Sequence, residues 1–492
     1  MNFVNSTYKL FTFDISNPIS FNSGTFLLFF TLFIAVYAAI YRNRTVRTLF
    51  VIAFSLFFYY KLTGWFLLVL LFTIAIDYFM AILIFKSKDK IRKRIFLIIS
   101  VCASLGLLVY FKYTNFFLAG FSALAGSSFT TLNIIIPLGI SFYTFRTISY
   151  IIDVYREEIK PTYHFFDYVF YMTFFPLLIA GPITRAKQIL PQARKHFSIK
   201  DVKVGNAIFL ILQGLIKKAI IADYIAQYCN LVFDAPGTYS GFENLIAIYA
   251  FAGQIYFDFS GYTDIAIGIS RLMGFNIGIN FNKPYHALNI TDFWRRWHIS
   301  LSSWLRDYLF TPMSLKLRNW GKAGIIFSLI VTFILCGFWH GASFTFIVWG
   351  GLHGLAMAYD ILTGKLRKRI KKKIKPGIYR FISWFITFHF IVFTWVFFRT
   401  QNLSSAMFIF KQIFSNMDLS YFVPFINVRG LFVAITFIGF ALYTIPSRWF
   451  PKITQRFVDM PLWAKAIVFL AVVQLAIQFQ SADVQPFLYA RF

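Results

Sequence analysis

Long apolar runs, separated by short polar or basic stretches, recur along almost the whole chain. The runs have the length of about 20 residues that an α-helix needs to cross a bilayer. They lack the sustained two-residue alternation of transmembrane β-strands. The pattern therefore predicts an all-α polytopic membrane protein with about 11–13 transmembrane helices. The predicted spans are 24–41, 48–63, 65–85, 95–111, 132–152, 164–181, 204–222, 243–271, 323–339, 343–362, 379–399, 430–446 and 462–480, with shorter apolar pieces at 114–125 and 404–415.

The composition supports a membrane protein. Of the 492 residues, 58% are hydrophobic and 14% are charged, and the mean hydropathy is +0.65. So few charged residues cannot cover the surface of a water-soluble protein of this size. The formal net charge of +29 would suit nucleic acid. Lys and Arg nevertheless collect between the apolar runs, where they set topology and meet lipid headgroups. We therefore expect the bilayer as a partner, and no nucleic acid. The three cysteines are isolated and predict no metal site.

The basic clusters predict the topology. Two of them, 42–47 and 86–94, flank a hydrophobic hairpin and belong on the cytoplasmic side, which places the N-terminal segment 1–23 outside. The cluster Lys365–Lys375 is expected on the cytoplasmic side as well. A further basic stretch precedes the last span, so that span should deliver the tail 481–492 to the outer face. No internal repeat is evident, and residues 1–492 are predicted to form one membrane domain.

The segment 272–322 is too polar for an ordinary span and too aromatic for a free loop. In-plane or re-entrant helices buried in protein are the tolerated alternative. On a helical wheel of Asp292–Tyr308, an apolar stripe lies beside a polar stripe. The apolar stripe contains Trp294, Trp297, Leu301, Trp304 and Leu305, and the polar stripe contains Arg295, His298, Ser302 and Arg306. Such a segment suits the boundary between hydrocarbon and a wet cavity.

Several ionisable residues lie in apolar surroundings, where they are functional candidates by default. His340 follows Trp339 in FILCGFWHGA; the alternative is a buried, hydrogen-bonded histidine. Asp258 lies inside a predicted span, and a structural pairing with an arginine such as Arg146 or Arg271 is favoured over catalysis. Arg295, Arg296 and Arg306 could contact phosphate or a thioester carrier, or anchor headgroups. His353 and His389 are interpreted as packing or hydrogen-bonding histidines.

Five sequence blocks together resemble one known family. They are PLGISFYTFRTISYIIDVYR (137–156), FFPLLIAGPITRAKQILPQ (174–192), FDFSGYTDIAIGISRLMGFNIGINFNKPY (257–285), TDFWRRWHISLSSWLRDYLFTP (291–312) and CGFWHGASFTFIVWGGLHG (336–354). Their wording and order resemble the bacterial membrane-bound O-acyltransferases. That group includes the membrane subunits for alginate O-acetylation and for teichoic acid D-alanylation, and the alginate-type branch looks nearest.

The resemblance implies an O-acyl transfer in which His340 is catalytic and His298 is its partner in a central tunnel. A neutral imidazole at position 340 could take the proton of an attacking hydroxyl, and a low-polarity site keeps the ring neutral. Trp297, Ser302 and Trp339 are predicted to line the tunnel. Arg295, Arg306 and Asp258 are predicted to join them in holding the donor. No bound cofactor or metal is expected.

The tail also carries a resemblance. It ends QPFLYARF, in which Phe487, Tyr489 and Phe492 form an FxYxxF pattern. The pattern is similar to the C-terminal motif of small partner proteins in the D-alanylation pathway. This similarity implies that the Tyr489 hydroxyl takes the acyl group before it passes outward. The positive-inside rule independently places this tail on the outer face.

The leading hypothesis is therefore a membrane O-acyltransferase in the bacterial cytoplasmic (inner) membrane. It would move an acyl group, acetyl first, from acyl-CoA or an acyl carrier protein to a cell-envelope or secreted polysaccharide. A separate periplasmic or surface acyltransferase or esterase-like protein would complete the transfer. The alternatives are D-alanyl or other acyl transfer to a different polymer, and a non-catalytic transporter or scaffold. A transporter would predict inverted repeats, which are not found.

Overall fold

The computed structural model describes residues 11–14, 19–21, 23–195 and 198–479, which form helices joined by loops, with no β-strand among them. The all-α prediction is confirmed. The chain divides into two compact units. Unit 1 contains Met1–Gly214 and Tyr262–Gly278, and unit 2 contains Leu215–Gly261 and Ile279–Ala490. The expectation of a single membrane domain over 1–492 stays a prediction.

Eight helical stretches in the described part of the chain are long and apolar enough to cross a bilayer. They are Arg44–Lys86, Lys90–Leu124, Val204–Asp234, Lys322–His340, Phe344–Leu362, Pro376–Arg399, Leu419–Thr444 and Leu462–Phe479. The polytopic prediction is confirmed with fewer spans than expected. The stretch Arg44–Lys86 contains two of the predicted spans, 48–63 and 65–85, as two successive helices, Arg44–Thr63 and Leu67–Lys86, with a non-helical Gly64 between them. The helix Gly24–Ile40 has 17 residues. The 32-residue helix Gly241–Leu272 carries polar and charged residues along its length.

Unit 1 is organised around mutually packed helices and an aromatic core. Its helices are α2 (Gly24–Ile40), α3 (Arg44–Thr63), α4 (Leu67–Lys86), α5 (Lys90–Leu124), α6 (Ile140–Tyr155), α7 (Phe165–Thr173), α8 (Phe175–Leu178), α9 (Ala186–Arg194) and most of α10 (Val204–Leu215). Helices α4, α5 and α6 pack against one another, and α3 packs on α7. Side-chain caps begin three of them: Ser23 for α2, Asn43 for α3 and Asp89 for α5. The ring of Phe175 contacts those of Phe33 and Phe58 in the core.

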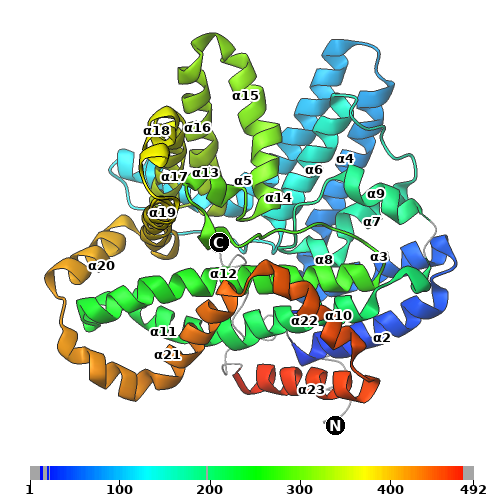
Figure 1. The fold of residues 1–492 in the computed structure, drawn as a ribbon. Coiled ribbons are helices and arrows are strands. Elements are labelled where there is room, and N and C mark those ends of the chain that lie inside the picture. Colours follow the sequence, from blue (N-terminus) through cyan, green and yellow to red (C-terminus); the bar gives the residue numbers. More distant parts are fainter. Residues whose placement is uncertain (1–10, 15–18, 22, 196–197, 480–492) are drawn as a thin grey trace. The chain divides into compact units, whose positions relative to one another are not determined.

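Unit 2 holds the remaining helices (Figure 1). They are α11 (Asp223–Asp234), most of α12 (Gly241–Leu272), α13 (Ile290–Trp294), α14 (Ile299–Leu305), α15 (Thr311–Lys316), α16 (Lys322–His340), α17 (Phe344–Leu362), α18 (Gly364–Lys373), α19 (Pro376–Arg399), α20 (Leu403–Ser415), α21 (Phe422–Thr444), α22 (Phe450–Asp459) and α23 (Leu462–Phe479). Two π-helical turns, Ile216–Ala222 and Arg306–Phe310, precede α11 and α15. Helix α16 packs along α17, which also contacts α13 and α19.

Glycines allow α16 and α17 to pack backbone against backbone. A Cβ atom added to Gly337 would lie 2.1 Å from the carbonyl oxygen of Phe346, and one added to Gly350 would lie 2.1 Å from that of Phe333. No side chain fits in so small a space, so glycine is required at both positions. The hairpin therefore holds His340, at the end of α16, against Trp349 in the first half of α17.

Residues 272–322 form only short helices. Helices α13 and α14 contain five and seven residues. The helical wheel drawn for Asp292–Tyr308 is wrong in one respect, because it assumes an uninterrupted helix. Between α13 and α14, His298 adopts φ 42° and ψ 56°, a left-handed conformation that side chains other than glycine rarely adopt. The chain therefore changes direction at this residue. The in-plane orientation of these helices in the bilayer stays a prediction.

Candidate functional site

His340 lies in an aromatic enclosure. It is the last residue of α16, and its side chain is 2% exposed. Its ring centroid lies 4.7 Å from that of Trp339, 5.2 Å from Trp349 on α17 and 5.1 Å from Phe398 on α19. Three aromatic rings thus surround the imidazole and exclude bulk water from it.

His298 is fully buried and is held by Asn280. The imidazole Nδ1 lies 3.3 Å from the side-chain oxygen of Asn280, and Phe259 packs edge-on at 4.6 Å. The same Asn280 oxygen accepts hydrogen bonds from the Ser300 backbone N–H at 3.0 Å and the Ser300 hydroxyl at 2.9 Å. The backbone N–H of Ile299 donates to the Asn280 carbonyl at 2.9 Å. Asn280 therefore fixes the start of α14 and the ring that precedes it.

These contacts determine the tautomer of His298. Because the backbone N–H of Ser300 can only donate, the Asn280 atom that it meets is the oxygen, which can only accept. The Nδ1 atom beside that oxygen must then carry the hydrogen, so Nε2 carries the lone pair. Burial lowers the pKa of His298 from 6.5 to about 3. The ring is therefore neutral at physiological pH, and its basic nitrogen is Nε2.

His353 on α17 has a different environment. The indole N–H of Trp294 donates to its Nδ1 at 3.2 Å, and its Nε2 lies 3.1 Å from the hydroxyl of Thr394. Since an indole N–H can only donate, Nδ1 accepts, and Nε2 carries the hydrogen that it gives to Thr394. Both ring nitrogens are used in structural hydrogen bonds. The interpretation of His353 as a hydrogen-bonding histidine is confirmed.

A chain of aromatic rings links the surroundings of His340 and His298 within unit 2. Trp349 contacts His340, and its centroid lies 5.9 Å from that of Trp395. Trp395 in turn lies 5.1 Å from Trp297, the residue before His298. All three indoles are at most 1% exposed. Both predicted catalytic histidines therefore belong to one continuous aromatic core.

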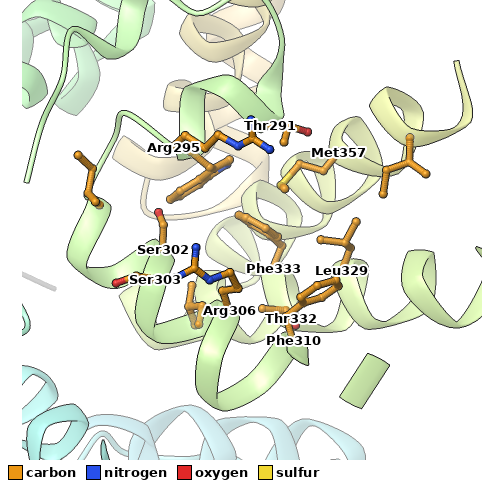
Figure 2. A pocket seen from close by; sticks show the side chains of 14 residues that line it. Thr291, Arg295, Ser302, Ser303, Arg306, Phe310, Leu329, Thr332, Phe333 and Met357 are labelled. Atoms are coloured by element: carbon orange, nitrogen blue, oxygen red, sulfur yellow. The ribbon is translucent and has the colours of Figure 1, made fainter. Parts of the chain in front are cut away.

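A cavity of about 420 Å³ lies beside this core, and we call it the arginine pocket. It is lined by Thr291, Trp294, Arg295, Ile299, Ser302, Ser303, Leu305, Arg306, Phe310, Leu329, Thr332, Phe333, Met357 and Ile361. Figure 2 shows the two arginines and two serines on one side, with Phe333, Leu329 and Met357 on the other. The lining combines an apolar wall with two guanidinium groups. Trp294 joins the pocket to the core, because its ring also contacts Trp349 with centroids 5.8 Å apart.

The two arginines of the pocket differ in whether a nearby carboxylate balances their positive charge. Arg306 pairs with Asp307 at 2.9 Å, and its side chain is 64% exposed. Arg295 forms no salt bridge within the part of the chain that the structure describes, whereas its neighbour Arg296 pairs with Asp292. The positive charge of Arg295 is therefore available to an anionic ligand in the pocket.

The other predicted site residues lie elsewhere. Trp297 is in the aromatic core and Trp339 packs on His340, so neither lines the arginine pocket. Asp258 is buried and forms an ion pair with Lys218, which also binds Asp223 at 2.7 Å. The expected structural pairing of Asp258 is thus confirmed, but the prediction of an arginine partner is wrong. The partner is a lysine 40 residues away in the chain. Tyr489 lies outside the described residues.

Two residues of this region were missed in the sequence. Asn280 and Trp349 both lie in the quoted blocks, yet neither carries a signal of its own. An asparagine in a loop usually makes a turn, and a tryptophan in an apolar run usually contacts lipid. Their importance comes from partners that are distant in the sequence.

Known proteins resemble this chain, and the match of a family model includes His298, His340 and the lining of the arginine pocket. The model of the membrane-bound O-acyltransferase family matches residues 156–400. The chain is 39% identical over 403 residues to a peptidoglycan O-acetyltransferase of Helicobacter pylori, covering 75% of this chain and 74% of that protein. It is 37% identical over 406 residues to "Probable alginate O-acetylase AlgI" of Pseudomonas aeruginosa, covering 80% and 75%. A teichoic acid D-alanyltransferase of Bacillus subtilis is 32% identical over 268 residues, covering 53% and 68%.

The low pKa of His298 predicts a specific dependence of stability on pH. A histidine that is neutral when folded but gains a proton when unfolded stabilises the protein above pH 6.5 and loses that contribution as pH falls toward about 3. His298→Asn, which tolerates the left-handed backbone, should flatten the pH dependence of the unfolding free energy by up to about 1.4 kcal/mol per pH unit. Unfolding in detergent between about pH 7.5 and about pH 5 measures this. His164→Asn, at an exposed histidine, is the control, and equal slopes for wild type and His298→Asn would contradict the prediction.

Proposed function

Since the chain belongs to the membrane-bound O-acyltransferase family and is a multi-pass membrane O-acyltransferase, we propose a specific transfer for it. It moves an acetyl group from a cytoplasmic thioester donor, acyl-CoA or an acyl carrier protein, toward a cell-envelope or secreted polysaccharide. Both termini face outward from the bacterial inner membrane, and a separate periplasmic or surface protein completes the transfer to the glycan.

The observation that carries this proposal is the environment of the two buried histidines. His340 and His298 belong to one aromatic core, and Trp294 connects that core to a pocket with two guanidinium groups. Acyl transfer to a hydroxyl needs a neutral base in a water-poor site, because water would hydrolyse the activated ester. It also needs a positive site for the phosphates of the donor. The aromatic enclosure of His340 and the two guanidinium groups of the arginine pocket, both in unit 2, support the proposal on these two points.

We assign the role of general base to His340. Its imidazole takes the proton of the acceptor hydroxyl as the oxygen attacks the thioester carbonyl carbon. The new C–O bond forms, the C–S bond breaks, and the proton passes to the departing thiolate sulfur. Donor and acceptor thus exchange one acyl group for one proton, and no redox partner is needed. The rings of Trp339, Trp349 and Phe398 around His340 keep bulk water away from this proton transfer.

His298 acts as a second polar group of the site. Its Nδ1–H is directed to Asn280, so its lone pair at Nε2 has a fixed orientation. A neutral imidazole with a fixed lone pair accepts a hydrogen bond from a hydroxyl or a thiol and orients it. Asn280 is then a positioning residue, because it acts through His298 and not on the substrate itself.

Acetyl is favoured over D-alanyl by the extent of the similarities. The relatives named for O-acetylation are 39% and 37% identical and cover 75% and 80% of this chain. The relative named for D-alanylation is 32% identical and covers 53%. D-alanyl transfer stays the second candidate. The transporter and scaffold alternatives find no counterpart among these relatives.

Replacement of His340 tests the chemistry. His340→Gln keeps a polar side chain but removes the base, and it should lower the rate of acyl transfer by about a hundred- to ten-thousand-fold. Acyl release from a labelled thioester by the purified protein, followed over a range of pH, measures this. His389→Gln is the control, because His389 lies near the backbone of Phe385 and outside the aromatic core of the site. A folded His340→Gln protein with undiminished transfer would refute the assignment.

The arginine pocket is tested separately through the donor. Arg295→Gln should raise KM for a phosphate-bearing thioester by about ten- to a hundred-fold, the worth of one charge-assisted hydrogen bond. The value of kcat should change little, since the phosphate is remote from the reacting carbon. Arg318→Gln, at an exposed residue that does not line the pocket, should leave KM unchanged. If Arg295 only anchors headgroups, Arg295→Gln will leave KM unchanged as well, and the donor role fails.

The proposed relay through Tyr489 makes a chemical prediction. Incubation with donor should leave an acyl ester on the Tyr489 oxygen, with release of the thiol. Intact-mass measurement should detect one adduct, whose mass identifies the acyl group. The adduct should be absent from Tyr489→Phe and from His340→Gln, and present in Tyr421→Phe. An adduct that persists in Tyr489→Phe would limit the tail to docking.

A further inference from the structure

A second cavity of unit 2 lies outside the site described above. It has a volume of about 490 Å³ and opens between α17 and α19, with the end of the 273–289 loop and Arg367 of α18 at its rim. Its walls are mostly apolar, with Leu355 and Ala356 from α17 facing Ile382 and Ile386 from α19. Leu355, Ile382 and Ile386 are exposed. The volume is within the range of about 300–1,000 Å³ that holds a small ligand or an acyl chain. We call this cavity the α17–α19 groove.

A strongly basic helix lies next to the groove. Helix α18 and the residue pair that follows it read GKLRKRIKKKIK, and Arg367 of this helix lines the groove. Arg367 pairs with Asp360, so that charge is compensated locally. The other basic side chains are Lys365, Lys368, Arg369, Lys371, Lys372, Lys373 and Lys375, which are exposed and form no salt bridge within the described residues. Lys371 lies one turn after Arg367 and continues the same helix face.

Apolar residues are exposed along α18 and at the end of α17. Leu362, the last residue of α17, and Leu366 and Ile370 of α18 recur at four-residue intervals and are 63%, 56% and 38% exposed. A basic helix with an exposed apolar stripe, placed between two membrane spans, is suited to the bilayer interface. Exposed lysines near a membrane surface attract anionic headgroups, whereas an acidic carrier protein would not require an apolar stripe or an apolar groove beside it.

We propose that the α17–α19 groove and α18 form a binding site for one anionic phospholipid. An acyl chain of the lipid occupies the groove, and its phosphate lies at the basic residues of α18 beside Arg367. The uncompensated positive charge selects an anionic headgroup, and the apolar walls require a lipid chain. The site is distinct from the arginine pocket, which is lined by other residues of α13, α14, α16 and α17.

The groove is connected to the proposed catalytic region through Asp360. The Asp360 carboxylate accepts hydrogen bonds from the backbone N–H of Thr291 at 2.9 Å and from its hydroxyl at 3.0 Å. Arg367 donates to the carbonyl of Leu288 at 3.3 Å. A lipid in the groove therefore lies against the start of α13, whose last residue, Trp294, lines the arginine pocket together with Arg295, which follows the helix. Its binding should stabilise the start of this short helix.

Native mass spectrometry of the full chain with equal amounts of phosphatidylglycerol and phosphatidylcholine tests the proposal. The wild type should retain one phosphatidylglycerol in preference to phosphatidylcholine. Lys368→Gln, Lys371→Gln and Lys372→Gln combined should reduce this retention by about a hundred-fold, because each of the three charges contributes about five-fold at a membrane surface. Ala356→Trp and Ser383→Trp, which fill the groove from its two sides, should each abolish it.

Matched controls separate this site from general attraction. Lys88→Gln, Lys90→Gln and Arg92→Gln combined remove three exposed charges from another cluster, and Phe381→Trp enlarges an exposed residue of α19 that does not line the groove. Both should keep phosphatidylglycerol, and thermal unfolding checks that all variants are folded. The proposal would be overturned if the wild type retained phosphatidylcholine as well as phosphatidylglycerol. It would also be overturned if the control variants lost as much phosphatidylglycerol as the site variants. So would an acidic carrier protein that displaces phosphatidylglycerol and still binds the groove-filled variants, because α18 would then be a protein-docking surface.

Discussion

The backbones of α16 and α17 meet at Gly337 and Gly350 with no side chain between them, and the rest of the site depends on that contact. A Cβ atom on either glycine would lie 3.2 Å from the Cα of the other. His340 comes one turn after Gly337, and Trp349 directly precedes Gly350. The close approach therefore brings the imidazole of His340 against the indole of Trp349. Trp349 also packs against Trp294 and Trp395. Larger residues would force the helices apart and dissolve this arrangement.

The buried polar groups of unit 2 follow a second constraint, since each one loses hydration unless a local partner replaces it. Lys218 meets this demand with two carboxylates, and His353 meets it with Trp294 and Thr394. Two buried histidines of unit 2, His353 and His298, differ in how their ring nitrogens are used. In His353 both ring nitrogens serve the fold. In His298 the hydrogen bond at Nδ1 fixes the tautomer and sets the direction of the basic nitrogen, which is the property a reaction can use.

The pattern of apolar runs predicted the helical, polytopic fold, and this prediction is confirmed because hydropathy is a property of adjacent residues. The two histidine blocks predicted the region of the site, and that assignment stays a prediction. The break at His298 was not predicted, because the sequence RRWHISLSS contains no glycine or proline to signal it. The cause is Asn280, which binds the start of α14 from 18 residues upstream. The lysine partner of Asp258 was not predicted either, because Lys218 is also distant from it in the sequence. Trp297 is buried, as its place on the apolar stripe predicted, but it lies between α13 and α14, and the sequence could not show that it packs on Trp395.

Helix α13 shows how the two cavities of unit 2 are related. With five residues it cannot be stable alone, because helix nucleation costs more than so few hydrogen bonds return. Its first turn is held by the Asn289 cap and by Asp360, and its last residue, Trp294, is held by His353. Two of these three supports come from α17. The side of α13 that forms the arginine pocket and the end that borders the α17–α19 groove are thus positioned by one helix. A displacement of α17 would change both cavities together, so donor binding at one and lipid binding at the other should be thermodynamically coupled.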